Sequence, residues 1–159
     1  MNINYRPVTD NDKQFLFKVY CFSRAVEMAQ VPWSDAQKEA FLMMQFQAQS
    51  SHYQEYYPNS DHKIILLDDQ AIGRLYLAYE DDRIEILDIA LLPQHRGSGI
   101  GKRIIGELTH QAETAGLPLC IYVETFNPSV GIFERLGFSQ KETDGVNIRF
   151  EWRPTSRLL

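Results

Sequence analysis

Residues 87–105 of this 159-residue chain read LDIALLPQHRGSGIGKRII. The apolar first part is typical of a buried β-strand, and the glycines after Arg96 lead into apolar residues at helical spacing. Glycines let the main chain approach a ligand closely, and the free N–H groups and dipole of a helix N-terminus attract an anion. We therefore expect a phosphate or pyrophosphate group to bind between Arg96 and Lys102.

The spacing of the glycines separates three kinds of phosphate-binding loop. A Walker-type loop needs a glycine and a Ser or Thr where this chain has Arg96 and Arg103. A dinucleotide fingerprint needs the pattern Gly-x-Gly-x-x-Gly, and neither register of this segment supplies the third glycine. The pattern Arg-x-x-Gly-x-Gly fits, with Arg96, Gly99 and Gly101. It resembles the acetyl-CoA pyrophosphate loop of the GNAT superfamily of N-acetyltransferases.

A second block, residues 119–138, supports the resemblance. A strand-like run leads to Asn127 and a short helix, in which the aromatic Phe133 comes shortly before a Gly-Phe pair. Pro128 suits the first helical turn, and Gly137 suits the left-handed position after the last turn. This order is similar to the late signature of the GNAT superfamily.

The order of expected elements indicates an α/β (α+β) fold. We expect a strand at 3–7, two helical segments before residue 58, strands at 64–67 and 71–79 joined by a turn at 68–70, a strand at 84–92, a helix at 101–115, and strands at 119–125, 138–143 and 147–152. The resemblance implies the GNAT fold, a central mixed, mostly antiparallel sheet of about seven strands with about four flanking helices. Its sheet would be splayed between the fourth and fifth strands. We expect a single GNAT domain over residues 1–159.

The composition is that of a globular protein, with 44% hydrophobic and 23% charged residues. A net charge of −5 argues against nucleic acid or an anionic membrane as a partner. The sequence has no transmembrane run, and residues 1–15 do not read as a signal peptide. Cys21 and Cys120 lack a CxxC spacing, and the four histidines lack metal-ligand spacing. We therefore expect a cytoplasmic protein with reduced thiols and no metal.

The resemblance implies acetyl-CoA as the co-substrate. Its pantetheine arm would pair with backbone groups of the fourth strand, and its pyrophosphate would lie on the glycine loop and the first helical turn. Asn127 and the aromatic residue of the late block would add contacts. The cofactor-binding residues implied are Ile89, Ala90, Leu91, Arg96, Gly97, Ser98, Gly99, Ile100, Gly101, Lys102, Asn127 and Phe133.

Acyl transfer from a thioester to an amine needs a group that accepts the amine proton. Glu85 stands where several GNAT members carry a catalytic Glu, and we predict that it is the general base. The structural alternative is an ion pair with Arg83 or Arg74. Asp88 and Glu124 are the other candidates, and a base acting through water is a further alternative.

The general acid is where the sequence departs from the family. The usual tyrosine of the late helix is replaced by Phe133, which cannot donate a proton. We predict that Tyr122 takes this role, although an aromatic residue at that position could simply pack on the sheet. The thiolate could also leave unprotonated, since free thiols titrate near pH ~8.5.

In GNAT folds the early helical region forms the acceptor wall, which corresponds here to the aromatic run at 46–57. Tyr53 and Tyr56 could bind an amine through cation–π contacts, together with Glu124, or could only pack the helix. The predicted acceptor is the primary amine of a small molecule or peptide. Family members often dimerise, which makes a homodimer an option. A GNAT-derived acyl-CoA-binding module without turnover, sensory or structural, is the alternative from another class.

Overall fold

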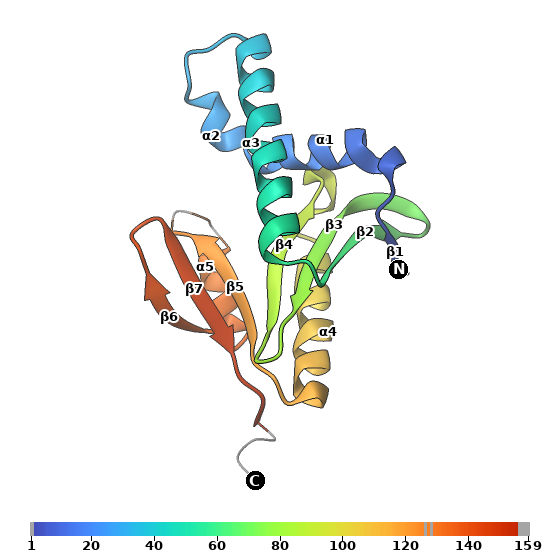
Figure 1. The fold of residues 1–159 in the computed structure, drawn as a ribbon, viewed down its shortest axis with the longest axis vertical. Coiled ribbons are helices and arrows are strands. Elements are labelled where there is room, and N and C mark those ends of the chain that lie inside the picture. Colours follow the sequence, from blue (N-terminus) through green and yellow to red (C-terminus); the bar gives the residue numbers. More distant parts are fainter. Residues whose placement is uncertain (1, 126, 128, 156–159) are drawn as a thin grey trace. The chain divides into compact units, whose positions relative to one another are not determined.

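Figure 1 shows the computed structural model, which describes residues 2–125, 127 and 129–155. The chain divides into two compact units. The first consists of Met1–Tyr76 and Ile89–Arg96, and the second of Leu77–Asp88 and Gly97–Leu159. Strands β3 (Gln70–Tyr79) and β4 (Ile84–Leu91) each supply residues to both units.

Seven described strands form one sheet in the order β1-β2-β3-β4-β5-β7-β6. The pairs β1–β2, β5–β7 and β6–β7 are antiparallel, and β4 runs parallel to β5. The predicted mixed, mostly antiparallel sheet is therefore confirmed. The bounds of the remaining strands are Ile3–Pro7 for β1, Ser60–Leu67 for β2, Leu119–Glu124 for β5, Ser139–Thr143 for β6 and Asn147–Trp152 for β7.

The first unit contains the helices α1 (Lys13–Ser23), α2 (Ala25–Ala29) and α3 (Asp35–Tyr56). The sequence predicts one helix before Pro32, but the chain breaks it at Arg24, whose backbone N–H bonds the carbonyls at the end of α1. The described residues consequently form five α-helices instead of about four. None of these helices has the length and apolar composition that crossing a bilayer requires.

The hairpin between β2 and β3 turns at Asp68 and Asp69, whose φ angles are 49° and 69°. Two successive left-handed residues match the twist of a β-hairpin, and Asp tolerates this backbone better than most residues. The predicted turn is confirmed. Further along β3, Gly73 lies so close to β4 that an added Cβ would overlap the carbonyl oxygen of Ala90.

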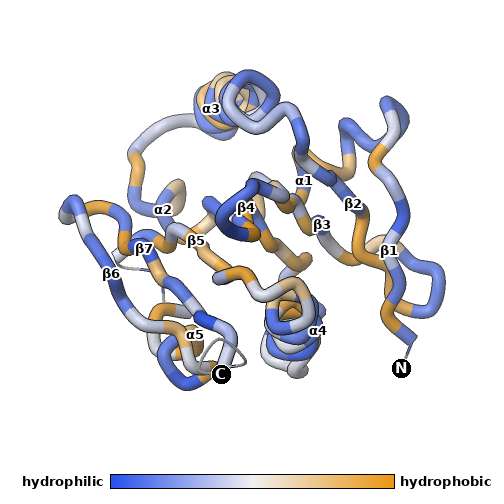
Figure 2. Tube along the Cα trace, turned by 60° about the horizontal axis from the view of Figure 1, so that its bottom comes forward, coloured by the Kyte–Doolittle hydropathy of each residue, from blue (hydrophilic) through white to orange (hydrophobic). Residues whose placement is uncertain are grey.

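The second unit contains α4 (Ile100–Ala115) and α5 (Val130–Arg135). The apolar residues of α4 recur at helical spacing and are buried: Ile100, Ile104, Ile105, Leu108 and Ala112. The helix ends at Gly116, which has a left-handed backbone with φ 71°, as the sequence predicts. Figure 2 shows β5 as largely apolar and the edge strand β6 as largely hydrophilic.

Strands β5 and β7 separate an apolar face from a polar one, because side chains alternate along a strand. The buried apolar face consists of Leu119, Ile121, Val123, Ile148 and Phe150. On the other face Cys120 is in register with Glu151, Tyr122 with Arg149, and Glu124 with Asn147. Glu85 of β4 is in register with Cys120, so a row of polar residues runs across three strands. The β4–β5 ladder joins only the first residues of β4, Ile84–Ile86, to Leu119–Ile121, as the predicted splay requires.

Candidate active site

The predicted phosphate loop lies between the short 3-10 helix η2 (Pro93–His95) and the first turn of α4. Gly97 and Gly99 both have a left-handed backbone, with φ of 75° and 88°. Gly99 is the N-cap residue of α4, and its carbonyl accepts the N–H of Arg103 at 3.0 Å. The sequence places these glycines correctly, and α4 begins one residue earlier than expected, at Ile100.

The first turn of α4 combines N–H groups that have no acceptor in the helix with open space beside its glycines. The backbone N–H groups of Ile100, Gly101 and Lys102 precede the first hydrogen bond of the helix and have no acceptor within it. A Cβ built on Gly97, Gly99 or Gly101 would meet no atom of the described chain within 4 Å. Packing therefore leaves room for a ligand against this turn, which fits a pyrophosphate.

Residues predicted to bind the pantetheine arm and one side of the pyrophosphate belong to the first unit. Ile89 and Ala90 are half-buried in β4, and Leu91 is buried. The Nε group of Arg96 donates a hydrogen bond to the carbonyl of Leu91 at 3.0 Å, which ties the start of the loop to the end of β4. The hydrogen-bond-donating groups of this guanidinium other than Nε make no bond to the described residues, and contact of Arg96 with a pyrophosphate stays a prediction.

The late block has clear structural roles. Asn127 Oδ1 accepts hydrogen bonds from the backbone N–H of Ser129 at 2.9 Å and from its hydroxyl at 2.7 Å, just before α5. Phe133 is buried, with its ring centroid 5.4 Å from Phe138 and 5.9 Å from Phe150. Contact of Asn127 and Phe133 with the cofactor stays a prediction. The predicted place of Pro128 in the first helical turn lies outside the described residues.

Glu85 is buried, with 2% of its surface exposed. Its Oε1 accepts a hydrogen bond from Nε of Arg83 at 2.9 Å, and Arg83 also donates to Asp82 at 2.9 Å. The hydrogen bond to Glu85 is the main reason why the pKa of Arg83 is raised. The ion pair expected as the structural alternative is thus present. Glu85 Oε2 is buried and accepts no hydrogen bond from the described residues, and the role of Glu85 as general base stays a prediction.

Tyr122 and Glu124 share the polar face of β5, as the alternation predicts. Tyr122 is 57% exposed, so it is not packed into the core. The guanidinium carbon of Arg149 lies 5.9 Å from the centre of its ring. The Tyr122 hydroxyl bonds no described residue and is therefore accessible to a ligand. Its predicted role as general acid stays a prediction.

The predicted acceptor wall lies in the first unit, at the C-terminal part of α3. Tyr53 packs edge-on against Tyr76 of β3, with ring centroids 5.0 Å apart. Tyr56 is largely exposed and lies beside His52, with ring centroids 4.6 Å apart. Arg74, which the sequence offered only as a partner of Glu85, is buried near Tyr76 and donates to the side chain of Gln49 at 2.7 Å. Tyr53 therefore has a packing role, and Tyr56 is accessible.

A family model for the acetyltransferase (GNAT) family matches residues 24–138 of the chain. The chain belongs to this family. It is 29% identical over 91 residues to the [ribosomal protein bS18]-alanine N-acetyltransferase of Haemophilus influenzae. This match covers 57% of the chain and only 59% of that relative.

Two solved structures share the GNAT fold over most of the chain. The PaiA N-acetyltransferase of Thermoplasma acidophilum, in complex with coenzyme A, has a TM-score of 0.72 and 21% identity, covering 96% of this chain and 99% of its own. The ribosomal-protein-S18-alanine N-acetyltransferase of Escherichia coli has a TM-score of 0.64 and 16% identity, covering 96% and 94%. At these identities the likeness concerns the fold.

This GNAT chain also holds a polar cluster that sequence reasoning missed. Arg149 of β7 donates to Cys120 Sγ at 3.2 Å and to Glu151 Oε2 at 3.3 Å. The other oxygen of Glu151 is ion-paired with Nε of Arg153 at 2.5 Å. The alternation of charged and apolar residues in β7 indicates a polar face, but it does not show which residues of other strands this face contacts.

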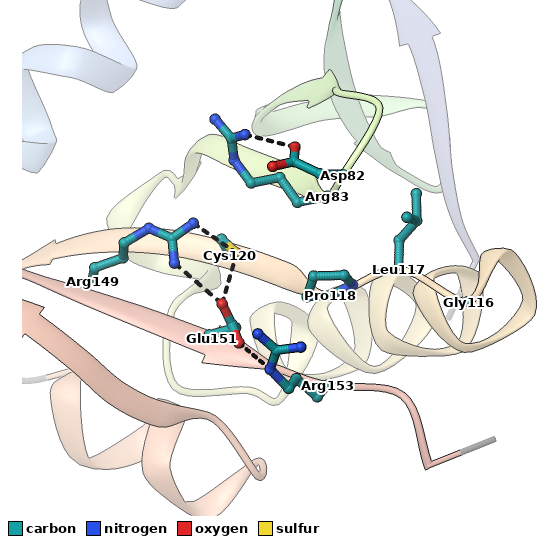
Figure 3. A pocket seen from close by; sticks show the side chains of 9 residues that line it. All are labelled: Asp82, Arg83, Gly116, Leu117, Pro118, Cys120, Arg149, Glu151 and Arg153. Carbon is teal, nitrogen blue, oxygen red and sulfur yellow. Dashed lines mark hydrogen bonds and ion pairs between the residues drawn. The ribbon is translucent and has the colours of Figure 1, made fainter. Parts of the chain in front are cut away.

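The cluster lines a pocket of about 390 Å³ in the second unit, drawn in Figure 3. Arg83 and Asp82 form one wall, and the loop of residues 116–118 forms another. Burial raises the pKa of the Cys120 thiol to about 11, so the thiol is protonated at neutral pH. Among the described residues, no group of His, Cys, Asp and Glu side chains could hold a metal ion.

Proposed function

We propose that this GNAT-family chain transfers an acetyl group from acetyl-CoA to a primary amine, directly within a ternary complex. The observation that carries the proposal is the loop before α4. Two left-handed glycines, open space beside them and first-turn N–H groups without acceptors in the helix support an anion site built from backbone. The family and the fold supply the expectation that this anion is the pyrophosphate of acetyl-CoA.

The residues that would hold acetyl-CoA come from β4 and α4. The backbone of Ile89–Leu91 would pair with the pantetheine arm, and the turn of Gly97–Lys102 with Arg96 would hold the pyrophosphate. Asn127 and Phe133 would add contacts from the late block. When bound, acetyl-CoA supplies the activated acetyl group. The chain's own task is then to orient the amine and to move its proton.

Direct transfer is favoured over an acyl-enzyme because neither cysteine suits nucleophilic attack. The thiolate is the reactive form of cysteine, and burial raises the pKa of both thiols in this chain. Cys120 is fully buried, and its thiol donates a hydrogen bond to Glu151 Oε2 at 3.9 Å. A thiol held neutral and enclosed cannot accept the acetyl group at a useful rate.

Glu85 supports proton removal from the amine. Arg83 holds one carboxylate oxygen, which leaves Oε2 as the acceptor. Burial within the sheet fixes this side chain in place, as general base catalysis requires. Tyr122, on the same face of the sheet with an accessible hydroxyl, is the candidate that protonates the leaving thiolate.

The acceptor class is also part of the proposal. The curated relative acts on an alanine of ribosomal protein bS18, so the N-terminal amine of a peptide is the first acceptor to test. In the first unit, the exposed ring of Tyr56 suits a cationic amine, and in the second unit the carboxylate of Glu124 does so by its charge. Small-molecule amines form the second class in the panel.

The test is a thiol-release assay with acetyl-CoA against peptides and small amines, run beside calorimetric binding of CoA. We expect turnover with one amine class. Glu85→Gln should lower kcat by about 10²- to 10⁴-fold and leave CoA affinity unchanged. Asp82→Asn is the matched control, because this exposed carboxylate also bonds Arg83, and its kcat should match that of the wild-type enzyme. Tyr122→Phe then tests the acid.

Two other outcomes would contradict the proposal in different ways. CoA binding without thiol release across the panel would favour the acyl-CoA-binding module, to which the buried and non-donating Phe133 lends support. Failure to bind CoA at all would refute the assignment of the glycine loop.

A further inference from the structure

The pocket of about 390 Å³ in the second unit lies outside the residues proposed to hold acetyl-CoA and the amine, although Arg83 on its wall also holds the proposed base Glu85. Its size is within the range of small-molecule sites. Three arginines lie on its wall, Arg83, Arg149 and Arg153, and none is among the residues proposed for acetyl-CoA or the amine (Figure 3). Arginine is the side chain best suited to planar oxyanions.

The wall opposite these arginines is held firmly. The loop of residues 116–118 is bonded to α4 through the N–H of Leu117, which donates to Ala112 at 3.0 Å. Its other end is bonded to β4, where the N–H of Ile84 donates to the carbonyl of Pro118 at 2.9 Å. The pocket is therefore a built feature of the second unit, bounded by fixed backbone.

Charge is unequal between the two sides of the pocket. On one side a single carboxylate, Glu151, serves both Arg149 and Arg153, one with each oxygen. Two arginines therefore share one bonded carboxylate, and the charge of Glu85 reaches Arg149 without an ion pair. On the other side Arg83 bonds two carboxylates, Asp82 and Glu85. The attraction for an anion is consequently centred on Arg149 and Arg153.

Arg149 is half-buried, and its guanidinium has few strong acceptors among the described residues. Only 17% of its side chain is exposed, yet Nη2 donates to Cys120 Sγ, and a neutral thiol is a weak acceptor. Its Nε donates to no described residue. A half-buried guanidinium gains stability when its N–H groups meet strong acceptors such as an oxyanion. The two Nη groups of Arg153 likewise donate to no described residue, and they lie next to the same carboxylate.

We propose that this pocket binds a compact oxyanion, a carboxylate or a phosphate group, between Arg149 and Arg153. Each guanidinium offers a fork of N–H donors that matches two oxygens of such an anion. Glu151 orients the two arginines toward one another, and Arg83 borders the site. The site is distinct from the phosphate loop at Gly97–Lys102, so it can exist whether or not the chain transfers acetyl groups.

The test observes the arginine side chains directly. The Nε–Hε resonances of Arg83, Arg149 and Arg153 are assigned with Arg→Gln variants and followed while sodium phosphate or sodium acetate is titrated at constant ionic strength. We expect saturable shifts at Arg149 and Arg153, with a dissociation constant in the millimolar range or tighter. Phosphate that binds at the glycine loop would instead shift the backbone amide resonances of that loop, so the experiment distinguishes the two sites.

Two variants test whether the anion binds at Arg153. Arg153 is largely exposed, so Arg153→Gln should fold and should weaken anion binding about tenfold through the loss of a charge-assisted bond. Arg135→Gln, at the exposed end of α5, is the matched control and should change nothing. Saturation by acetate alone identifies a carboxylate ligand, and by phosphate alone a phosphorylated one.

The absence of a saturable shift with both anions would overturn the proposal. Equal affinity in wild type and Arg153→Gln would also overturn it, because the anion would then not lie between these arginines. Arg149→Gln is a second variant for the same test, and the conclusion rests on Arg153→Gln if the substitution at the half-buried Arg149 prevents folding.

Discussion

Gly99 and Gly116 lie at opposite ends of α4 with similar left-handed backbones, with φ of 88° and 71°. An added Cβ would meet no atom of the described chain within 4 Å at either position. Alanine at each should therefore cost only the left-handed strain, about 1 kcal/mol. For a chain of this size, that cost lowers Tm by roughly 2–4 °C. We expect Gly99→Ala and Gly116→Ala to be destabilised alike.

The two variants should differ in their affinity for CoA. At Gly99 the new methyl group stands where a pyrophosphate would approach the N–H groups of the first helical turn. Losing one such charge-assisted hydrogen bond costs about 1.5–3 kcal/mol, which weakens binding roughly ten- to hundredfold. Gly116 is at the far end of the 16-residue helix, so its substitution leaves CoA affinity unchanged.

Calorimetric titration of CoA gives the affinity, and thermal unfolding of the same samples gives the stability. Both variants destabilise α4, so comparing the CoA affinity of Gly99→Ala with that of Gly116→Ala cancels the effect of this destabilisation on binding. If Gly99→Ala and Gly116→Ala bind CoA equally well, the turn before α4 does not hold the pyrophosphate and the reasoning is refuted.

Two further predictions concern titration and thiol chemistry. The hydrogen bonds of Arg6 lower the pKa of Asp12 to about 2, so the carboxylate stabilises the fold above its ordinary pKa and this contribution is lost as the pH falls toward 2. In urea unfolding at neutral pH, Asp12→Asn should lower the free energy of unfolding by about 1 kcal/mol. The difference from the wild-type protein should narrow in acid, and Asp10→Asn should not lower the free energy of unfolding. Thiol reagents near pH ~8 should label the half-buried Cys21 first and the buried Cys120 only on unfolding. Equal labelling rates in the native protein would contradict the burial of Cys120.

Local sequence signals predicted the glycine loop, the helix that follows it and the hairpin turn. Each depends on residues close together in the chain, such as a left-handed Gly99 before a helix or two aspartates between strands. The break of the first helix at Arg24 gave no such signal, because neither glycine nor proline marks it.

Contacts that depend on strand register could not be predicted from sequence. The row of Glu85, Cys120 and Glu151 exists only because β5 lies between β4 and β7 in a particular register. A shift of one residue would turn each side chain to the other face of the sheet. For the same reason the sequence could offer both Arg83 and Arg74 as partners of Glu85, and only the folded chain selects Arg83.

The closeness of β3 to β4 at Gly73 bears on how natural variation and mutational scans of this chain should be interpreted. Any residue other than glycine adds a Cβ that overlaps the Ala90 carbonyl, and a backbone atom cannot turn aside as a side chain can. Each substitution would displace β4 at Ile89–Leu91, the stretch proposed to pair with the pantetheine arm. In a saturation library, position 73 should therefore tolerate no replacement and look like a catalytic position. Selection at position 73 would then preserve the close approach of β3 and β4, not a catalytic group. Related proteins that keep this strand register should also keep the glycine.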